Sequence, residues 1–389
     1  MRKICFITGS RAEYGILAHL MHLVKDSPEA DLQIVATNMH LSPRHGMTVA
    51  NIVEDGFNVD FRIPSYPEGD EPSDTVTAMT KTMNGLSEAF KVLRPDIIVI
   101  LGDRYEMLAA ASAALIFNIP IAHIHGGEVT EGAYDDAIRH AVTKMSYLHF
   151  ASTRTYADRI ISMGEDPARV FDVGALGVEN ALRESLISRS ELEDFLNFNL
   201  GEKFCLVTFH PVTLQPGEEE LQTRNLTGAL SQFIPLGWKL LVTMPNSDTG
   251  GDKVAQILEN WRKENPDSVI NVKSLGRKRY FSALSHSSAL IGNSSSGIIE
   301  APAFRIPTIN VGDRQKGRIM GPSVISCPCE PEKIISSLKK AMEPDFIRNI
   351  RQLPMEILNP YYKKNTAQDI LMHLLKEPLS VSKSFHDIK

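Results

Sequence analysis

TVTAMTKTMNGLSEAFKVLRPDIIVILG, residues 75–102, is the stretch that decides the fold. In its first part, apolar residues recur at three- and four-residue steps on one face, which predicts a helix. They are Val76, Met79, Met83, Leu86, Phe90 and Leu93. We interpret this methionine-rich face as core or subunit interface. The second part, PDIIVILG, lacks period-two alternation, which is typical of a strand in a parallel sheet covered on both faces.

The same combination of an apolar run and a helical pattern recurs along the whole chain. The strand candidates are KICFIT, LQIVAT, PDIIVILG, IPIAHI and YLHFAS in the first half, and FCLVTFH, WKLLVTM, SVINV, SALIGN and IPTINV in the second. Because strands and helices alternate in two series, we expect an α/β protein with two Rossmann-like, doubly wound domains.

The boundary between the two domains is expected near VGALGVENAL, residues 173–182, where two glycines precede a polar helix. The first domain then spans residues 1–178 and the second 179–375, with the last helices able to pack back on the first domain. The final residues 376–389, KEPLSVSKSFHDIK, have no apolar period and predict a flexible tail.

Composition excludes several classes of function. The 389 residues are 43% hydrophobic and 23% charged, as in a well-cored globular protein, and the net charge is −6. No broad basic field is available for nucleic acid or an anionic membrane. The four cysteines form no CxxC pair, which favours a reduced, cytoplasmic location. The N-terminal run ICFI is too short for a signal peptide, and no run approaches the ~18 residues of a membrane span.

Ligands of open α/β sheets bind where strands end and helices begin. KICFIT is followed by GSRAEYG, where Arg11 replaces the second glycine of a dinucleotide fingerprint and could reach a phosphate. The alternative is a tight turn with a solvated arginine. SALIGN is followed by SSSGIIE, in which Ser294 and Ser295 could cradle a diphosphate and Glu300 could bind a ribose diol. The alternative is a serine N-cap and a surface glutamate.

Three further strands end in polar residues. PDIIVILG delivers Asp103 and Arg104, which we interpret as an ion pair, FCLVTFH delivers His210, and WKLLVTM precedes a segment that contains Asn246. Each could be a cap or turn by itself. Together, five polar strand ends predict one ligand cleft between the two domains.

HIHGGEVTEGAYDDAIRH, residues 123–140, holds three histidines, four acids and three glycines. The side chains of this stretch that could transfer a proton or bind an ion are His123, His125, Glu128, Asp135, Asp136, Arg139 and His140. A zinc site needs about four ligands, and no His or Cys follows the HxH pair at a zinc spacing. We therefore favour an acid/base site without a metal or other cofactor, in which the glycines let the backbone pass close to a ligand.

With these residues in view, the chain resembles the hydrolysing UDP-N-acetylglucosamine 2-epimerases of the bacterial sialic and legionaminic acid pathways. The motifs that carry the resemblance are TGSRAEYGIL, GDRYE, HIHGGE, YDDAIRH, FHP, PNSDTGG, GNSSSGIIE and INVGDRQKGR. The resemblance implies a glycosyltransferase-B-like fold with the UDP-sugar in the interdomain cleft, and a homodimer or homotetramer.

The resemblance also implies a reaction. UDP leaves carbon 1 as a proton is taken from carbon 2, and the resulting 2-acetamidoglucal is reprotonated on the opposite face and hydrated to N-acetylmannosamine. Asp103 would be a catalytic acid, Asp135 a second acid/base group, and Arg139 would orient the substrate or an acid. His210 would contact the diphosphate or assist the leaving group. UDP would be held by Arg11, Arg104, Asn246, Ser294, Ser295 and Glu300, with Arg314 of the loop GDRQKGR closing near the nucleotide.

One departure leaves the proton donor and acceptor unassigned. Several relatives carry glutamate where this sequence has His125, so either His125 or Glu128 would take over its task. Alternatives for the whole protein are the same chemistry on UDP-N,N′-diacetylbacillosamine, a non-hydrolysing epimerase, a glycosyltransferase of the same architecture, and a silent nucleotide-sugar binder.

Overall fold

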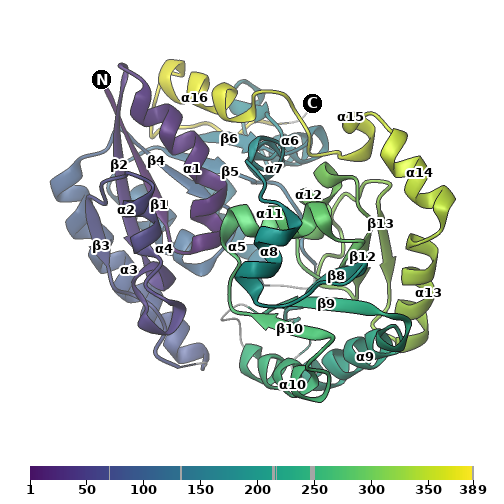
Figure 1. Cartoon of the computed structure of the whole chain (residues 1–389). Helices are drawn as coiled ribbons and strands as arrows, with labels where there is room; N and C mark the ends of the chain where they lie inside the picture. Colours follow the sequence, from purple (N-terminus) through teal and green to yellow (C-terminus); the bar gives the residue numbers. More distant parts are fainter. Residues whose placement is uncertain (70, 132–133, 213–214, 216, 246–249, 388–389) are drawn as a thin grey trace. The chain divides into compact units, whose positions relative to one another are not determined.

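The computed structural model describes residues 1–69, 71–131, 134–212, 215, 217–245 and 250–387. The chain forms two compact units (Figure 1). Unit 1 consists of Met1–Glu128, Asp135–Glu179 and Lys363–Lys389, and unit 2 of Val129–Tyr134 and Asn180–Tyr362. Each unit is built on its own parallel sheet, so the predicted α/β fold with two Rossmann-like units is confirmed.

The sheet of unit 1 has seven strands in the order β3-β2-β1-β4-β5-β6-β7, all paired in parallel. The strands are β1 (Arg2–Thr8), β2 (Ala30–Thr37), β3 (Phe61–Ile63), β4 (Ile97–Leu101), β5 (Ile121–Ile124), β6 (Leu148–Ala151) and β7 (Val170–Asp172). The chain starts in the middle and winds outward in both directions, which places a topological switch point between β1 and β4.

Helices cover both faces of this sheet. They are α1 (Arg11–Asp26), α2 (Val49–Glu54), α3 (Pro72–Leu93), α4 (Tyr105–Ile116), α5 (Asp135–Met145), α6 (Arg154–Ser162) and α16 (Thr366–Lys376), with α7 (Leu176–Arg183) where the chain passes to unit 2. Along β1, Ile4 and Phe6 enter the core cluster of α1 and α16, whereas Cys5 and Ile7 enter that of α3 and α4. Because both faces are covered, the strand shows no polar alternation.

The apolar stripe of α3 is divided between the core and the surface. Leu86 and Phe90 are buried in the core, whereas Val76 is 62% and Met83 is 39% exposed. From the sequence, core and subunit interface were alternatives for this stripe. In the structure one part of the stripe lies in the core and the other part faces solvent.

Unit 2 has a six-stranded parallel sheet in the order β10-β9-β8-β11-β12-β13. Its strands are β8 (Lys203–Thr208), β9 (Trp238–Thr243), β10 (Val269–Val272), β11 (Ala289–Gly292), β12 (Thr308–Val311) and β13 (Val324–Cys327). Its helices are α8 (Arg189–Leu196), α9 (Glu219–Ser231), α10 (Gly251–Glu264), α11 (Gly276–His286), α12 (Ser296–Ile299), α13 (Pro331–Ala341), α14 (Pro344–Gln352) and α15 (Met355–Leu358). Both units also contain short 3₁₀ turns. Those of unit 1 are η1 (Asn38–Leu41), η2 (Pro43–His45) and η3 (Pro167–Arg169), and those of unit 2 are η4 (Ile234–Leu236) and η5 (Ala301–Phe304).

Three strands, β3, β7 and β13, have no counterpart among the predicted strands. All three lie at a sheet edge and are only three or four residues long. An edge strand is half-exposed and needs no long apolar run, which is why the hydrophobic pattern did not reveal it.

Residues 376–387, predicted to be a flexible tail, lie against the rest of unit 1, where Lys383 donates a hydrogen bond to the buried Glu165.

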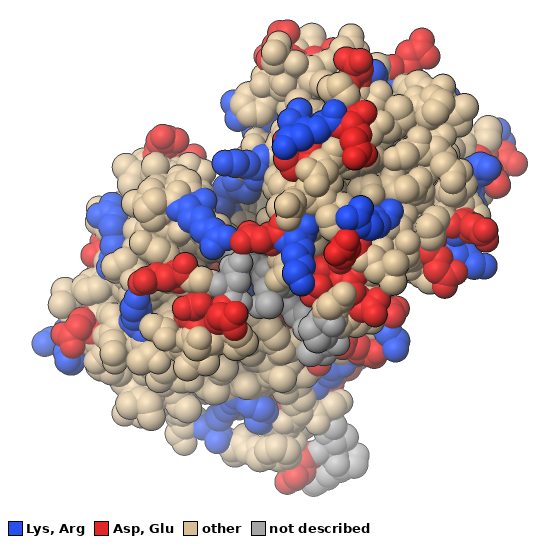
Figure 2. All heavy atoms as spheres, turned by 90° about the horizontal axis from the view of Figure 1, so that it is seen from below, with Lys and Arg blue, Asp and Glu red and all other residues tan. Residues whose placement is uncertain are grey.

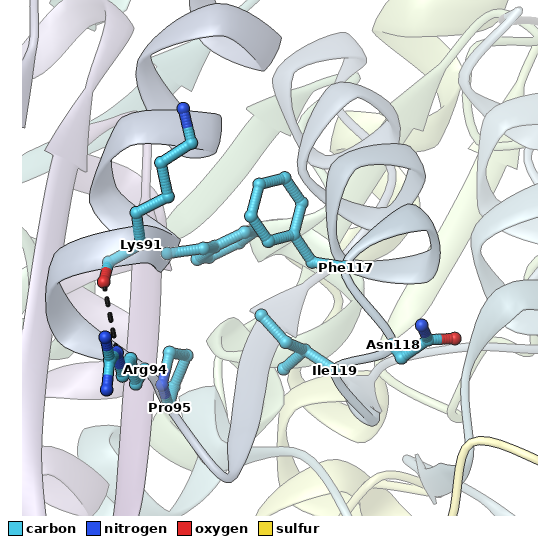
Figure 3. A pocket seen from close by; sticks show the side chains of 7 residues that line it. Lys91, Arg94, Pro95, Phe117, Asn118 and Ile119 are labelled. Atoms are coloured by element: carbon cyan, nitrogen blue, oxygen red, sulfur yellow. Dashed lines mark hydrogen bonds between the residues drawn. The ribbon is translucent and has the colours of Figure 1, made fainter.

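A hollow of about 480 Å³ opens where α3 and α4 end (Figure 3). It is lined by Phe90, Lys91, Arg94, Pro95, Phe117, Asn118 and Ile119. Because these residues precede β4 and β5, the hollow lies at the amino edge of the sheet, opposite the polar strand ends.

On the face shown in Figure 2, Lys and Arg side chains are interspersed with Asp and Glu. Within the part of the chain that the structure describes, no helix combines the length and the apolar character that a membrane crossing needs.

Candidate functional site

The first polar cluster lies at the carboxyl edge of the unit 1 sheet, after β4. Gly102 adopts a φ of +76°, and Asp103 follows it. Asp103 forms an ion pair with Arg139 of α5, while Arg104 bonds Glu106 through its Nε, at 2.7 Å. The predicted pairing of Asp103 with Arg104 is therefore wrong, because each charge has a partner from a helix.

Arg139 organises the acids of this cluster. Its side chain is 1% exposed. Besides the ion pair with Asp103, it donates to the main-chain oxygen of Glu128 at 2.9 Å and to Asp136 Oδ1 at 3.3 Å. A guanidinium can serve several acceptors at fixed angles, so it holds both carboxylates in place. Asp103 and Asp136 remain 23% and 29% exposed, so they can meet a ligand.

Helix α5 begins at Asp135, with Asp136 also in its first turn. Carboxylates are stabilised near the positive end of a helix dipole. One of the two has a histidine neighbour, because His140 Nε2 lies 3.5 Å from Asp136 Oδ2. Burial lowers the pKa of His140. Asp135 and Asp136 thus occupy the same helix start as the buried Arg139, as the motif YDDAIRH suggested.

His125 and Glu128 form a second acid/base pair in unit 1. His125 Nδ1 lies 3.6 Å from Glu128 Oε1, and the same carboxylate oxygen accepts a 2.7 Å hydrogen bond from Ser152. His125 adopts the left-handed conformation, with φ at +66°. This conformation is uncommon for a residue with a Cβ, and strained backbone is enriched at functional sites. Glu128 is 1% and His125 8% exposed, so the carboxylate is the more deeply buried partner.

The two glycines after His125 are required by packing within the protein, and the close approach of a ligand to them stays a prediction. A Cβ on Gly127 would lie 2.5 Å from the main-chain oxygen of Tyr156, and Gly127 has a φ of +73°. A Cβ on Gly126 would lie 2.9 Å from Thr143 Oγ1. Both positions therefore require glycine for close packing against α5 and α6.

His123, the first histidine of the stretch, has a structural place. It is fully buried, with Nε2 2.7 Å from the main-chain oxygen of Gly102 and Nδ1 3.2 Å from Thr143 Oγ1. Burial lowers the pKa of His123 to about 3, so the ring is neutral at physiological pH. It connects the end of β4 with β5 and α5.

Arg11 and Arg104, predicted to bind UDP, lie at the carboxyl ends of β1 and β4. Arg11 opens α1, and burial lowers its pKa. Arg104 is bound by two acids that the sequence did not reveal, Glu106 and, at 3.7 Å, Glu13. Glu13 also accepts from the main-chain nitrogens of residues 9 and 10, which makes it the capping box of α1. The sequence signal that could have revealed Glu13 is the capping box, a serine followed three residues later by a glutamate at the start of a helix.

The second cluster lies in unit 2, at the ends of β8 and β11. His210 is 6% exposed, and its main chain exchanges two hydrogen bonds with the side chain of Asn293, at 2.8 and 2.7 Å. Asn293 is fully buried and was missed as a site residue, although it is the last residue of the predicted strand SALIGN. It fixes the loop that carries His210.

Ser294 and Ser295 follow Asn293, as predicted, but they open a helix of only four residues, α12. Ser294 Oγ accepts from the nitrogen of Ser296 at 3.4 Å. Glu300, expected further into this helix, is its C-cap and is 8% exposed. Because α12 is so short, its dipole contributes little, and a diphosphate would be bound mainly through hydroxyls and main-chain nitrogens.

The loop after β12 also belongs to this cluster, because Arg314 Nη1 donates to the main-chain oxygen of Asn293 at 3.2 Å. The same loop contacts the segment 129–134, through Lys316 Nζ and Glu131 Oε2 at 3.4 Å. Arg314 is therefore placed beside the serine loop, and the closing of its loop near a nucleotide stays a prediction. Asn246 falls outside the described residues.

No three His, Cys, Asp or Glu side chains are grouped as metal ligands anywhere in the described ranges. The metal-free reaction stays a prediction, with a chelation test given below. Unit 1 contains carboxylates of different exposure, an imidazole and a buried arginine. These are the kinds of group that carry out proton transfer in enzymes. Unit 2 supplies hydroxyls, a histidine and an arginine, which suit an anionic group.

Comparison with known sequences agrees with this chemistry. The chain matches the UDP-N-acetylglucosamine 2-epimerase family over residues 22–375. It is 37% identical to polysialic acid biosynthesis protein P7 of Escherichia coli over 100% of this chain and 98% of that protein. It is also 37% identical to the hydrolysing GDP/UDP-N,N′-diacetylbacillosamine 2-epimerase of Campylobacter jejuni, over 90% of this chain and 89% of that protein.

Solved structures share the fold. The UDP-GlcNAc 2-epimerase of Neisseria meningitidis, bound to UDP-GlcNAc, superposes with a TM-score of 0.81 at 18% identity, over 96% of this chain and 100% of that one. A UDP complex of MnaA from S. aureus gives a TM-score of 0.78 at 18% identity, over 96% of both chains. The fold is thus glycosyltransferase-B-like, and the chain belongs to the UDP-N-acetylglucosamine 2-epimerase family.

Proposed function

We propose that the chain is a hydrolysing 2-epimerase that converts UDP-N-acetylglucosamine to N-acetylmannosamine and UDP, for the biosynthesis of sialic acid. The observation that carries the proposal is the grouping of Asp103, Asp136 and the start of α5 around the buried Arg139. Family membership supports it, as does a relative that takes part in polysialic acid biosynthesis.

The reaction needs two proton transfers at carbon 2, on opposite faces of the sugar. A base removes the carbon 2 proton while the bond from carbon 1 to the UDP oxygen breaks, giving 2-acetamidoglucal. An acid then returns a proton to the other face, and water adds its hydroxyl to carbon 1. Asp103, held by Arg139, is one of these groups, and Asp135 is a candidate for the other.

His125 and Glu128 are the two candidates for the task that the resemblance described above gives to a glutamate at position 125. Glu128 is held by Ser152 and lies beside the imidazole of His125, which is the more exposed partner. A carboxylate placed next to a histidine fixes the orientation of the ring. His125 is therefore a second candidate, besides Asp135, for the proton transfer that Asp103 does not perform, and Glu128 is its supporting residue.

The remaining predicted residues bind the leaving group in this proposal. The charge that develops on UDP is met by arginines, hydroxyls and main-chain nitrogens. At the diphosphate we place Arg11, Arg104, His210, Asn246, Ser294, Ser295 and Arg314, whereas Glu300 binds the ribose diol of UDP.

The test is proton NMR of the enzyme with UDP-N-acetylglucosamine in deuterated water. We expect free N-acetylmannosamine with deuterium at carbon 2, together with UDP. UDP-N-acetylmannosamine as the product would identify a non-hydrolysing epimerase. Binding of UDP without turnover would point first to the diacetamido substrate considered below, and after that to a transferase or a silent binder.

A second candidate is the same chemistry on UDP-N,N′-diacetylbacillosamine. Two relatives, at 37% and 34% identity, are named for that substrate. The two substrates differ at positions 4 and 6 of the sugar, so kcat/KM measured for both decides between them. A preference of more than about a hundredfold, or roughly 3 kcal/mol, would identify the natural substrate.

We further propose a cytoplasmic homo-oligomer. All four cysteines are free thiols, which fits a reducing compartment. Val76 and Met83 of α3, with Leu115 and Ile116 of α4, are exposed apolar side chains that a second copy could cover. Light scattering after size exclusion, with Ile116→Lys as the variant, tests the assembly, and a monomeric wild type refutes it.

A further inference from the structure

The last residues of the chain lie beyond the family match and yet make specific contacts in unit 1. The match ends at residue 375, and α16 ends at Lys376. Lys383 then donates from Nζ to Glu165 Oε2 and to the main-chain oxygen of Ser146, both at 2.8 Å. Three residues on, the nitrogen of His386 donates to the main-chain oxygen of Gly164 at 2.9 Å. A tail free in solution would make none of these contacts.

Glu165 is the centre of this contact. Its side chain is 1% exposed, and it accepts from Lys144 at 2.5 Å and from Lys383 at 2.8 Å, with His149 Nε2 at 3.1 Å. These donors lower the pKa of Glu165 to about 2, against the opposing effect of burial. Burial lowers the pKa of His149, so the buried charge of Glu165 is balanced mainly by the two lysines.

Phe385 provides a second contact at the same place. Gly164 has a φ of +86°, and a Cβ there would overlap the ring of Phe385, so the aromatic ring lies directly on the glycine. The ammonium of Lys144 lies 4.9 Å from the ring centroid, within the range of a cation–π interaction. Lys144 is therefore held both by the Phe385 ring, although Phe385 is 66% exposed, and by Glu165.

Lys144 stands in the last turn of α5, whose first turns carry Asp135 and Arg139. An α-helix of 11 residues is a short rod of about 16 Å, so fixing its last turn constrains the position of its first turn. Lys144 also donates to the main-chain oxygen of Met163 at 3.0 Å, which ties the end of α5 to the end of α6.

We propose that residues 380–387 form a C-terminal clamp that holds α5, with Lys383 and Phe385 as positioning residues for the acid/base groups at its start. The effect on turnover rests on the proposed function, whereas the effect on the order of α5 does not. Without the clamp, Glu165 loses one of its two lysines and Lys144 loses the aromatic ring, so α5 can shift. A shift of about 1 Å at a catalytic group costs on the order of a hundredfold in rate.

The experiment uses the full-length chain with Lys383→Met and, as the conservative variant, Lys383→Arg. The control is Lys339→Met, because Lys339 is an exposed lysine in α13 of unit 2. We expect Lys383→Met to lower kcat about ten- to a hundredfold with KM changed less than about threefold, and Lys383→Arg to recover most of the loss. In hydrogen exchange, α5 should exchange about tenfold faster in Lys383→Met, with α9 unchanged.

Phe385→Ala keeps the salt bridge and is the second variant, used where Lys383→Met fails to fold. It should accelerate exchange in α5 in the same direction. Unchanged α5 exchange in the folded variants overturns the clamp, as does a drop in kcat that Lys339→Met reproduces. If the wild type turns over neither UDP-sugar, the proposed function fails, and the exchange data still decide the clamp.

Discussion

Replacing Arg139 with lysine is expected to lower both stability and turnover, although the charge is kept. Arg139 is 1% exposed and serves three acceptors, and one of them, the main-chain oxygen of Glu128, lies at 2.9 Å from Nη1. A lysine has a single nitrogen and cannot reach all three. A lost hydrogen bond to a charged group costs about 1.5–3 kcal/mol, and an unpaired buried carbonyl about 1–3 kcal/mol. Asp103 and Asp136 are partly exposed, so water offsets part of this, and about 3 kcal/mol remains.

The assay combines differential scanning calorimetry with steady-state kinetics. For a unit of about 200 residues, each kcal/mol corresponds to about 2–4 °C, so the transition of unit 1 should fall by about 6–12 °C. With Asp103 displaced, kcat/KM should fall by about a hundredfold or more. The matched control is Arg154→Lys, since Arg154 pairs with Asp158 in an exposed salt bridge and its loss should cost less than about 0.5 kcal/mol. An Arg139→Lys variant that melts within about 2 °C of the wild type and keeps its kcat/KM refutes the reasoning.

Three other outcomes are expected. Asp103→Asn should lower turnover by about a thousandfold or more in the NMR assay while calorimetry shows UDP still bound, and normal turnover would remove Asp103 from the mechanism. EDTA should leave activity intact, whereas a loss that zinc restores would make His125 a candidate metal ligand. Burial and the charge of Glu106 raise the pKa of Glu13 to about 8. The folded chain therefore binds a proton there that the unfolded chain releases above about pH 4.3, and this stabilisation is lost as the pH rises through about 8. Glu106→Gln should make the fall in Tm between about pH 5 and about pH 8 shallower, and parallel curves for the two proteins would contradict this.

The central strands could be predicted from the sequence because burial on both faces leaves a continuous apolar run. PDIIVILG contains β4 (Ile97–Leu101), and FCLVTFH contains most of β8 (Lys203–Thr208). The edge strand β7 reads VFD, with each residue half-buried, and nothing in such a tripeptide separates a strand from a loop. Its conformation is set by the pairing with β6, which is a property of the tertiary structure.

The end of the chain shows a different limit. KEPLSVSKSFHDIK has no apolar period, and low periodicity predicts a tail. Lys383, Phe385 and the main chain of His386 hold the segment, and their partners Glu165 and Gly164 lie more than two hundred residues earlier. The periodicity of a short segment carries no information about contacts with residues so far away in the sequence. Single long-range interactions therefore cannot be predicted from it.

The same distinction explains what the sequence could say about the site. In a parallel sheet the carboxyl ends of neighbouring strands share one edge, so a polar residue after an apolar run is located by topology alone. This placed Asp103 and His210 at the strand ends where the structure has them. The partner of each charge is set by side chains from distant segments, because Asp103 and Arg139 are 36 residues apart and Arg104 is met by Glu13 of the first helix. Two adjacent residues of opposite charge, such as Asp103 and Arg104, therefore suggest an ion pair from the sequence alone. In the structure each of them pairs with a residue of a helix instead. The chemistry at the site depends on these partners, since Arg139 decides where the carboxylate of Asp103 points.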